Sequence, residues 1–300
     1  MGFLQNTIFG TAEARAEARA ARADAADLAA RLADADQRWE FSPAPSDNDE
    51  PVFIFSAGWR SGSTLLQRMV MAERSALIWG EPFDRSQIIQ SMADQWRGFT
   101  GAWPRDRYIA PPGDHNAVDD WVANFYPTPD ALRQAHLSCL NRLFKTPAAE
   151  RGYARWGLKE IRLRIEHAVF LKWLYPNARF LFLLRHPQRA YASYRPWRKW
   201  HRAWPDRPVM TPYAFASFWR EMATDFVQGH ARIGGLLVRY EELEANVDRM
   251  SEYLGINVAR PADLPVRRGR DAAPDRRVPW AETAIISVAT ATARRMAGYD

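Results

Sequence analysis

The sequence contains a single cysteine, Cys139, in 300 residues. One cysteine excludes an intramolecular disulfide framework and a cysteine-rich zinc site, and it is consistent with a reducing compartment. No run of about eighteen apolar residues occurs, and the first ten residues pass directly into a charged, alanine-rich stretch. These absences predict a cytoplasmic protein without a membrane span or a secretory signal.

Lysine is also scarce, because only four of the 41 basic residues are lysines. Residues 1–50 contain five Arg and ten Asp or Glu, a net charge of −5, so the total of +6 leaves +11 for residues 51–300. Such a surplus suits an anionic partner, which can be a nucleotide, another polyanion or a membrane surface. The charge alone does not choose among them.

Alanine dominates residues 11–40, which predicts a long helix. Leu28 and Leu32 are its only large apolar residues before Trp39, too few for a clear heptad seam, so a solvated arm is favoured over a self-associating helix. The run SPAPSDNDEP that follows has the composition of a linker. We therefore expect an N-terminal helical arm and linker over 1–50 and one domain over 51–300.

From residue 51, short apolar runs alternate with segments of helical spacing. This alternation predicts an α/β fold with a mainly parallel sheet and flanking helices. The predicted strands are 52–57, 77–79, 154–159, 179–185 and 236–240, and the predicted helices are 63–73, 161–175, 187–200, 213–229, 241–253 and 281–297. The stretch 96–130 is expected to form a long excursion.

A Gly/Ser turn with one arginine connects the first strand to the first helix. It contains Arg60, Ser61, Gly62, Ser63 and Thr64. Free backbone N–H groups and the positive end of the helix would point to one place, which predicts a P-loop-like site for phosphate or sulfate. The structural alternative is that Ser61 or Ser63 simply caps the helix.

Two features separate this turn from the loop of nucleotide triphosphatases. Their pattern G-x-x-x-x-G-K-[ST] requires a lysine where Ser63 stands, and only three residues separate Gly58 from Gly62. The fourth predicted strand ends in Arg185, so it does not supply an aspartate for magnesium. A metal-dependent kinase or ATPase is therefore disfavoured.

The same strand begins a second candidate anion site. Its apolar run 180–184 delivers Arg185 to the carboxyl edge of the sheet, and Pro187 starts a helix that carries Ser193. An arginine with a nearby hydroxyl forms a compact phosphate site. Taken alone, the pattern is equally compatible with an arginine at a strand end and an incidental serine.

Together, the loop and the later R-x-P-x-x-x-x-x-S pattern resemble the sulfotransferases that use 3′-phosphoadenosine 5′-phosphosulfate. The resemblance spans roughly 51–299 and includes, in the expected order, RSGSTLLQRM, WGEPFDRSQII, WGLKE, RYEEL and a closing RMAGYD. It implies that the first loop holds the 5′-phosphosulfate, and that Arg185 and Ser193 hold the 3′-phosphate. Tyr240, in the RYEEL segment, joins the implied donor-binding residues.

The departures place the chain nearer to the tyrosylprotein and carbohydrate branch of that family than to its cytosolic phenol branch. Arg60 replaces the lysine of the cytosolic branch, and His186 replaces the more frequent aspartate after Arg185. The basic histidine of the K-T-H segment has no counterpart, since the nearest string is FKTP at 144–147.

The resemblance also implies catalytic roles. Arg60 would neutralise the sulfuryl group, Lys159 would donate to the leaving oxygen, and Glu81 would accept the proton of the acceptor hydroxyl. His186 is the reserve base because it lies near the expected donor site. The alternatives are that Lys159 is a surface lysine paired with Glu160 and that Glu81 marks a turn.

Two further segments are candidates for the rim of the site. Arg276 and Arg277 would close over the 3′-phosphate, or they belong to a solvated loop. The segment 195–204 interleaves three Trp with basic residues, which suits an acceptor rim, although an amphipathic helix with its Trp packed inward has equal weight.

The sequence therefore predicts a metal-independent sulfotransferase that acts on a hydroxyl acceptor. The acceptor can be a carbohydrate, a phenol or tyrosine, or another small alcohol, and nucleic acid is not an expected partner. The alternatives are a kinase that uses ATP and magnesium, and a non-catalytic polyanion or nucleic-acid binder.

Overall fold

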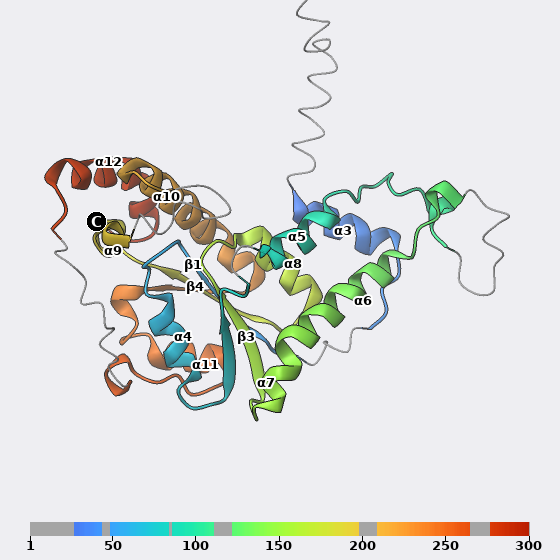
Figure 1. Ribbon diagram of the computed structural model, residues 1–300, viewed down its shortest axis with the longest axis horizontal. Coiled ribbons are helices and arrows are strands. Elements are labelled where there is room, and N and C mark those ends of the chain that lie inside the picture. Colours follow the sequence, from blue (N-terminus) through green and yellow to red (C-terminus); the bar gives the residue numbers. More distant parts are fainter. Residues whose placement is uncertain are drawn as a thin grey trace, which may run out of the picture. The chain divides into compact units, whose positions relative to one another are not determined.

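The computed structural model describes residues 27–43, 49–83, 86–110, 122–197, 209–264 and 277–299 (Figure 1). The described helices and strands are α3 Leu28–Arg38, β1 Val52–Ser56, α4 Ser63–Met71, β2 Ala76–Gly80, α5 Ile88–Trp96, α6 Pro129–Leu140, the π-helix Asn141–Lys145, α7 Thr146–Glu150, β3 Arg155–Glu160, α8 Ile165–Leu174, β4 Arg179–Leu184, α9 Pro187–Tyr194, α10 Pro212–Gly229, β5 Leu236–Arg239, α11 Val247–Leu254 and α12 Trp280–Met296. Short 3₁₀ turns lie between several of them. The chain forms two compact units, unit 1 (residues 1–44 and 89–137) and unit 2 (residues 45–88 and 138–300).

Unit 2 is built on a five-stranded sheet in the order β2-β3-β1-β4-β5. All four strand pairings are parallel, which confirms the predicted α/β class and its mainly parallel sheet. β1 lies in the centre, where Ile54 is in register with Lys159 of β3 and with Leu181 of β4. Every strand therefore ends at the same edge, which we call the carboxyl edge.

The two faces of the sheet have different side chains because successive residues of a strand point to opposite faces. One face is aliphatic and includes Val52 and Ile54 of β1, which share a buried cluster with residues of α4 and α11. The other face is aromatic: Phe55 lies 5.7 Å from Phe182, which in turn lies 5.0 Å from Phe226 of α10. Every residue of the central strand β1 is buried, as expected for a strand of a parallel sheet that is covered on both faces.

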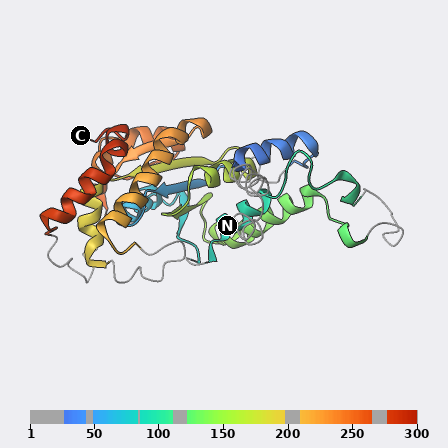
Figure 2. The same ribbon diagram turned by 90° about the horizontal axis from the view of Figure 1, so that it is seen from above.

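The C-terminal helix α12 lies beside α10, as both views of the ribbon show (Figure 2). It is also tied to α9, since Glu282 accepts hydrogen bonds from Tyr191 Oη at 2.8 Å and from Arg195 Nε at 2.7 Å. These contacts fix the helix that carries Ser193.

In unit 1, the described part of the predicted N-terminal arm is α3. Asp27 caps it by accepting from Ala30 N at 3.2 Å, and Leu28, Leu32 and Ala35 are buried. The expectation of a solvated arm is therefore wrong for α3, because the few apolar residues form a covered stripe. Residues 1–26 lie outside the described part.

The C-terminal end of α3 is held by Arg38. Its guanidinium donates to the carbonyl oxygens of Thr100 and Pro104 at 2.6 and 2.7 Å and to Asp106 Oδ1 at 2.7 Å. An arginine on an alanine-rich helix thus organises a segment of the predicted excursion, 96–130, of which 111–121 lie outside the described residues.

Most predicted elements of unit 2 are present within a few residues of their predicted ends, and two helices begin later than expected. α8 begins at Ile165 because Arg162 points back to Glu160 and Arg164 has an extended backbone, with ψ of 174°. The segment predicted as a helix over 241–253 starts as a 3₁₀ turn, Tyr240–Glu242, and becomes α11 only at Val247. Among the described helices, none has the length and apolar character needed to cross a membrane.

Candidate anion-binding and catalytic site

The turn between β1 and α4 contains three residues with a left-handed backbone conformation. Gly58, Arg60 and Gly62 have φ of 81°, 60° and 94°, in the left-handed region. Arginine adopts this region at a cost, and such strain concentrates at functional sites. The turn is closed by Gly58 N, which donates to Ser56 O at 2.8 Å.

Neither serine of this turn caps α4. Gly62 occupies the N-cap position and makes no side-chain hydrogen bond, and Ser61 Oγ instead donates to Gly58 O at 2.9 Å. Ser61 also contacts Ser56 through its hydroxyl. The helix-capping explanation of the two serines is therefore wrong, and the hydroxyl of Ser61 stabilises the turn.

The beginning of α4 presents a row of backbone donors. Within the described residues, the N–H groups of Ser61, Gly62, Ser63 and Thr64 donate to no backbone carbonyl. The first N–H groups of a helix have no partner inside it, and together with the helix dipole they attract anions. The loop therefore has the donor set that a phosphate or sulfate requires.

Position 62 requires glycine for two reasons: its positive φ and the close approach of a neighbouring side chain. A Cβ at this position would lie 2.1 Å from Cδ2 of Tyr240, which follows β5. Any side chain at position 62 would collide with that ring, so the contact brings the loop of β1 and the end of β5 together across the carboxyl edge.

Two arginines join the loop to the end of β4. Arg185 Nη1 donates to Arg60 O at 2.8 Å, and its guanidinium carbon lies 4.3 Å from the ring centroid of Tyr240. Arg60 Nε donates to Ser193 Oγ at 3.2 Å, and Arg60 also lies over the ring of Trp197 at 5.8 Å. The hydrogen bond to Ser193 thus comes from Arg60 of the first motif.

Two aromatic residues of α10 contact the ends of β1 and β4. The sequence analysis did not identify them. Trp219 Nε1 donates to Arg185 O at 3.0 Å, which orients the residue that ends β4. Phe218 packs on Trp59 with ring centroids 4.9 Å apart, and a Cβ at Gly58 would lie 2.9 Å from Phe218. In an amphipathic helix these two aromatics look like ordinary core residues, so no local signal marks them.

The predicted catalytic pair lies at the ends of β2 and β3. Lys159 Nζ donates to Glu81 Oε1, and Glu81 N donates to Lys159 O at 2.8 Å. The side chain of Lys159 is 7% exposed, whereas that of Glu81 is 26% exposed. Lys159 is therefore a buried lysine with a carboxylate partner that still reaches solvent.

The alternative pairing of Lys159 with Glu160 is wrong because Glu160 has another partner. Arg162 Nη2 donates to Glu160 Oε2 at 2.8 Å, and both side chains are almost completely buried. Burial raises the pKa of Glu160, while the hydrogen bond from Arg162 opposes the shift. Successive residues of β3 point to opposite faces, which explains why Lys159 and Glu160 have separate partners.

The structure brings the predicted residues together in the order of the strands. Read along the carboxyl edge from β2 to β5, the strands end near Glu81, Lys159, Arg60, Arg185 and Tyr240. Ligands of open α/β sheets bind at this edge. Five segments that are distant in the sequence therefore contribute to one line of polar and aromatic groups.

His186, the reserve base, lies beside this line. Its backbone N donates to Glu241 Oε1 at 3.1 Å, and its ring meets that of Tyr299 at 5.4 Å. It lines a pocket of about 390 Å³ with Arg239 and Glu241 among other residues. Burial, followed by the charge of Arg294, lowers the pKa of His186, which favours the neutral imidazole.

The two segments predicted for the rim of the site are described only in part. Arg277 is exposed just before α12, whereas Arg276 lies outside the described residues. Trp197 is half-buried beside Arg60, and the rest of the Trp-rich segment, from residue 198, also lies outside the described part.

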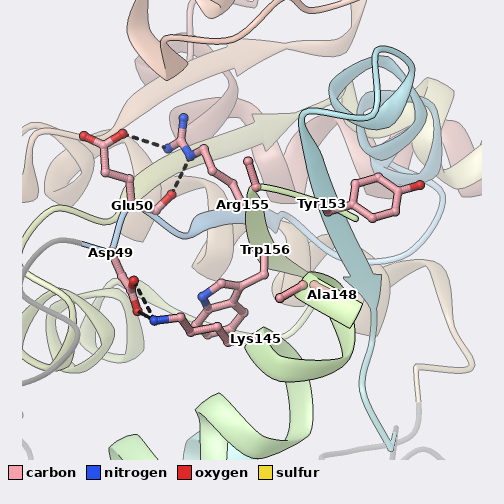
Figure 3. A pocket seen from close by; sticks show the side chains of 9 residues that line it. Asp49, Glu50, Lys145, Ala148, Tyr153, Arg155 and Trp156 are labelled. Carbon is pink, nitrogen blue, oxygen red and sulfur yellow. Dashed lines mark hydrogen bonds and ion pairs between the residues drawn. The ribbon is translucent and has the colours of Figure 1, made fainter. Parts of the chain in front are cut away.

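A second group of cations lies at the opposite, amino edge of the sheet. There, Lys145 Nζ donates to both carboxylate oxygens of Asp49 at 2.7 and 2.6 Å, and Arg155 donates to Glu50 O at 2.7 Å (Figure 3). These residues line a pocket of about 220 Å³. Burial lowers the pKa of Arg155, and the charge of Glu50 opposes the shift. The pocket's cations thus already have carboxylate neighbours.

No group of three or more His, Cys, Asp or Glu side chains gathers as a metal site in the part of the chain that the structure describes.

The fold is a parallel α/β sheet whose central strand leads through a glycine turn to the first residues of α4. Residues 51–258, more than half of the chain, match the model of the sulfotransferase family. The chain therefore belongs to the sulfotransferase family. Among curated proteins, no significantly similar relative is found.

Solved structures of sulfotransferases are similar to the chain at low identity. The sulfotransferase domain of the Synechococcus olefin synthase has a TM-score of 0.44 and 16% identity, covering 87% of this chain and 99% of its own. A sulfotransferase from Mycobacterium avium has a TM-score of 0.44 and 14% identity, with 93% and 85% covered. One from Alicyclobacillus acidocaldarius has a TM-score of 0.41 and 15% identity, with 84% and 97% covered.

Proposed function

We propose that the protein transfers a sulfuryl group from 3′-phosphoadenosine 5′-phosphosulfate to a hydroxyl acceptor, without a metal ion. The observation that carries the proposal is the line of groups along the carboxyl edge, in which the loop of β1 contacts Arg185 and Tyr240. A donor with phosphate groups at both ends needs two neighbouring anion sites. The amides of the loop after β1 form one of these anion sites, and Arg185 forms the other.

The loop is suited to the 5′ end of this donor. The N–H groups of residues 61–64 lie at the positive end of α4, and Gly62 leaves room for the ring of Tyr240 beside them. Arg60 adds a charge and a guanidinium fork next to these amides. Arg185 and Ser193, one step along the edge, would hold the 3′-phosphate, and Tyr240 would pack beside it.

The donor supplies an activated sulfuryl group, so the protein has mainly to position reactants and stabilise charge. Glu81 accepts the proton of the acceptor hydroxyl as the new oxygen–sulfur bond forms. Lys159 donates a hydrogen bond toward the oxygen of the phosphate bridge as the old bond breaks. The hydrogen bond from Lys159 Nζ to Glu81 Oε1 places the proposed donor and the proposed base next to each other.

The acceptor belongs to the small-molecule or glycan alcohols and phenols. The N-terminal segment is a candidate for self-association, and the location we propose is cytoplasmic. The position of Arg60 in the loop supports a relationship with the tyrosylprotein and carbohydrate branch.

Thermal unfolding with two nucleotides tests the donor. Adenosine 3′,5′-bisphosphate at about 100 times its Kd should raise the midpoint by a few degrees, because it binds only the folded state. ATP with magnesium at the same concentration should have a smaller effect. A shift with magnesium ATP and none with the bisphosphate would contradict the proposal and favour a kinase.

A further inference from the structure

Phe83 is an exposed aromatic residue next to the proposed base. It follows Glu81 and Pro82 at the end of β2, on the carboxyl edge, and it is 62% exposed. Phenylalanine is usually buried because its ring is entirely apolar. An exposed ring at this edge therefore gains little from burial and leaves most of its surface available for contact with a ligand.

The backbone of Phe83 is also unfavourable. Its φ is 56°, in the left-handed region that glycine and asparagine occupy readily and a bulky residue rarely does. Strain of this kind persists where the surrounding structure maintains it, and it concentrates at ligand sites. Two unfavourable features thus coincide at a residue two positions from Glu81.

The ring of Phe83 is supported from one direction. Its centroid lies 6.5 Å from that of Phe144, which is buried and stacks on Trp156 at 6.2 Å. The carbonyl oxygen of Phe144 accepts a hydrogen bond from Trp79 Nε1 at 3.0 Å, which links this pair back to β2. The contacts hold the ring in place while most of its surface stays open.

We infer that Phe83 is the platform for the acceptor, and that the acceptor carries its reacting hydroxyl on a ring. A flat ring packs well on an open aromatic face, and a hydroxyl on that ring would be brought toward Glu81. Both a phenol and a pyranose offer such a face, whereas an acyclic alcohol does not. This inference rests on the proposed sulfuryl transfer.

Three acceptors and three variants test it. Transfer of labelled sulfate is measured with 4-nitrophenol, an alkyl glucoside and 1-hexanol, which separate a phenol, a pyranose and an acyclic alcohol. The variants are Phe83→Gly, Phe83→Tyr and, as a matched control, Tyr213→Ala, since Tyr213 is 61% exposed at the start of α10. Binding of adenosine 3′,5′-bisphosphate is measured for each.

For the preferred ring acceptor, Phe83→Gly should raise KM roughly tenfold, the loss expected for one aromatic stacking contact. Its unfolding midpoint should not fall, because glycine tolerates the left-handed backbone, and its affinity for the bisphosphate should not change. Phe83→Tyr should keep KM close to that of the original protein, as should Tyr213→Ala. A purely structural role for Phe83 would instead lower the midpoint of Phe83→Gly.

Two results would overturn the inference. One is an unchanged KM in Phe83→Gly for a protein that binds the bisphosphate and transfers sulfate. The other is transfer to 1-hexanol with a kcat/KM equal to that for the ring acceptors. Failure of the proposed function has a different signature, because the unaltered protein would then neither bind the bisphosphate nor transfer sulfate to any of the three acceptors.

Discussion

The two edges of the parallel sheet use cationic side chains in different ways. At the amino edge, Lys145 and Arg155 contact Asp49 and Glu50, carboxylates from the segment just before β1 (Figure 3). At the carboxyl edge, Arg185 contacts a carbonyl oxygen and an aromatic ring. A carboxylate compensates the charge of Lys145, whereas the carbonyl oxygen and the ring orient the guanidinium of Arg185.

Lys159 lies at the carboxyl edge and, like Lys145 at the amino edge, has a carboxylate partner. Its partner Glu81 is more exposed than Lys159 itself, so the carboxylate can meet an incoming molecule. This difference distinguishes the proposed catalytic pair from the pairs near Asp49 and Glu50, and the following substitutions test it.

The largest effect is expected for Glu81→Gln. Removing the proton acceptor should lower kcat by roughly 10²–10⁴-fold, the usual contribution of general base catalysis. The Kd for adenosine 3′,5′-bisphosphate should stay the same, because Glu81 lies at β2, away from Arg185 at β4. Steady-state kinetics and calorimetric titration measure the two quantities.

The control for Glu81→Gln is Glu150→Gln, which alters an exposed carboxylate at the end of α7 and should leave kcat unchanged. Normal turnover in Glu81→Gln would exclude Glu81 as the base and would direct attention to His186.

Gly62→Ala should have the next largest effect, and Gly152→Ala is its control. Both glycines have positive φ, of 94° and 79°, so both alanines strain the backbone by about 1–2 kcal/mol. Only at Gly62 does the new Cβ also meet Tyr240. Gly62→Ala should therefore weaken bisphosphate binding at least about tenfold beyond any effect of Gly152→Ala. Equal affinities in the two variants would contradict the role of the loop.

Arg185→Ala and Arg155→Ala compare the two edges directly. Loss of a charge-assisted hydrogen bond costs about 1.5–3 kcal/mol, so Arg185→Ala should weaken bisphosphate binding roughly 10- to 100-fold with little change in the midpoint. Arg155→Ala should lower the unfolding midpoint and leave bisphosphate binding unchanged, because Arg155 donates to Glu50 O and to Leu254 O within the fold. The comparison fails if both variants lose stability and neither loses affinity.

A smaller effect is expected on the pH dependence of stability, and it comes from His136 in unit 1. This pH dependence has to be separated from any titration of groups at the carboxyl edge. Burial lowers the pKa of His136 to about 4, below its ordinary value of 6.5. The folded protein therefore binds this proton less readily than the unfolded chain, and its contribution is lost as pH falls from about 6.5 toward 4. We expect a loss of about 1 kcal/mol between pH 7 and 5.5.

Denaturant unfolding at several pH values measures this loss, and His136→Gln should flatten it. An unchanged pH dependence in His136→Gln would show that another group is responsible. The kcat values of Glu81→Gln and the original protein should then be compared at a pH where both are fully folded, so that the difference reports the role of Glu81 in the reaction.

The parts of the molecule that could be predicted from the sequence are those with local signals. The apolar runs of β1 and β4 end abruptly in a glycine turn and in Arg185, so their positions and the parallel sheet followed directly. The hydrogen bond between Arg60 and Ser193 could not be predicted in the same way. Ser193 and Arg185 lie in one motif, yet Ser193 accepts from Arg60, 133 residues away in the chain.

Long-range packing explains the other differences. Trp219 occupies a position that suits any buried aromatic, and only the folded chain shows that its indole holds Arg185 O. In α3, the pattern of Leu28 and Leu32 was too sparse to predict burial, because covering a short stripe depends on what packs against it. Local propensity does not contain that information.

The contact between Gly62 and Tyr240 also restricts how the sequence can diverge. As long as a large ring occupies position 240, every residue but glycine is excluded at position 62, and a smaller residue at 240 would have to arise first. The order of these changes is therefore fixed by geometry: position 240 can change while Gly62 is kept, but position 62 should not change before position 240.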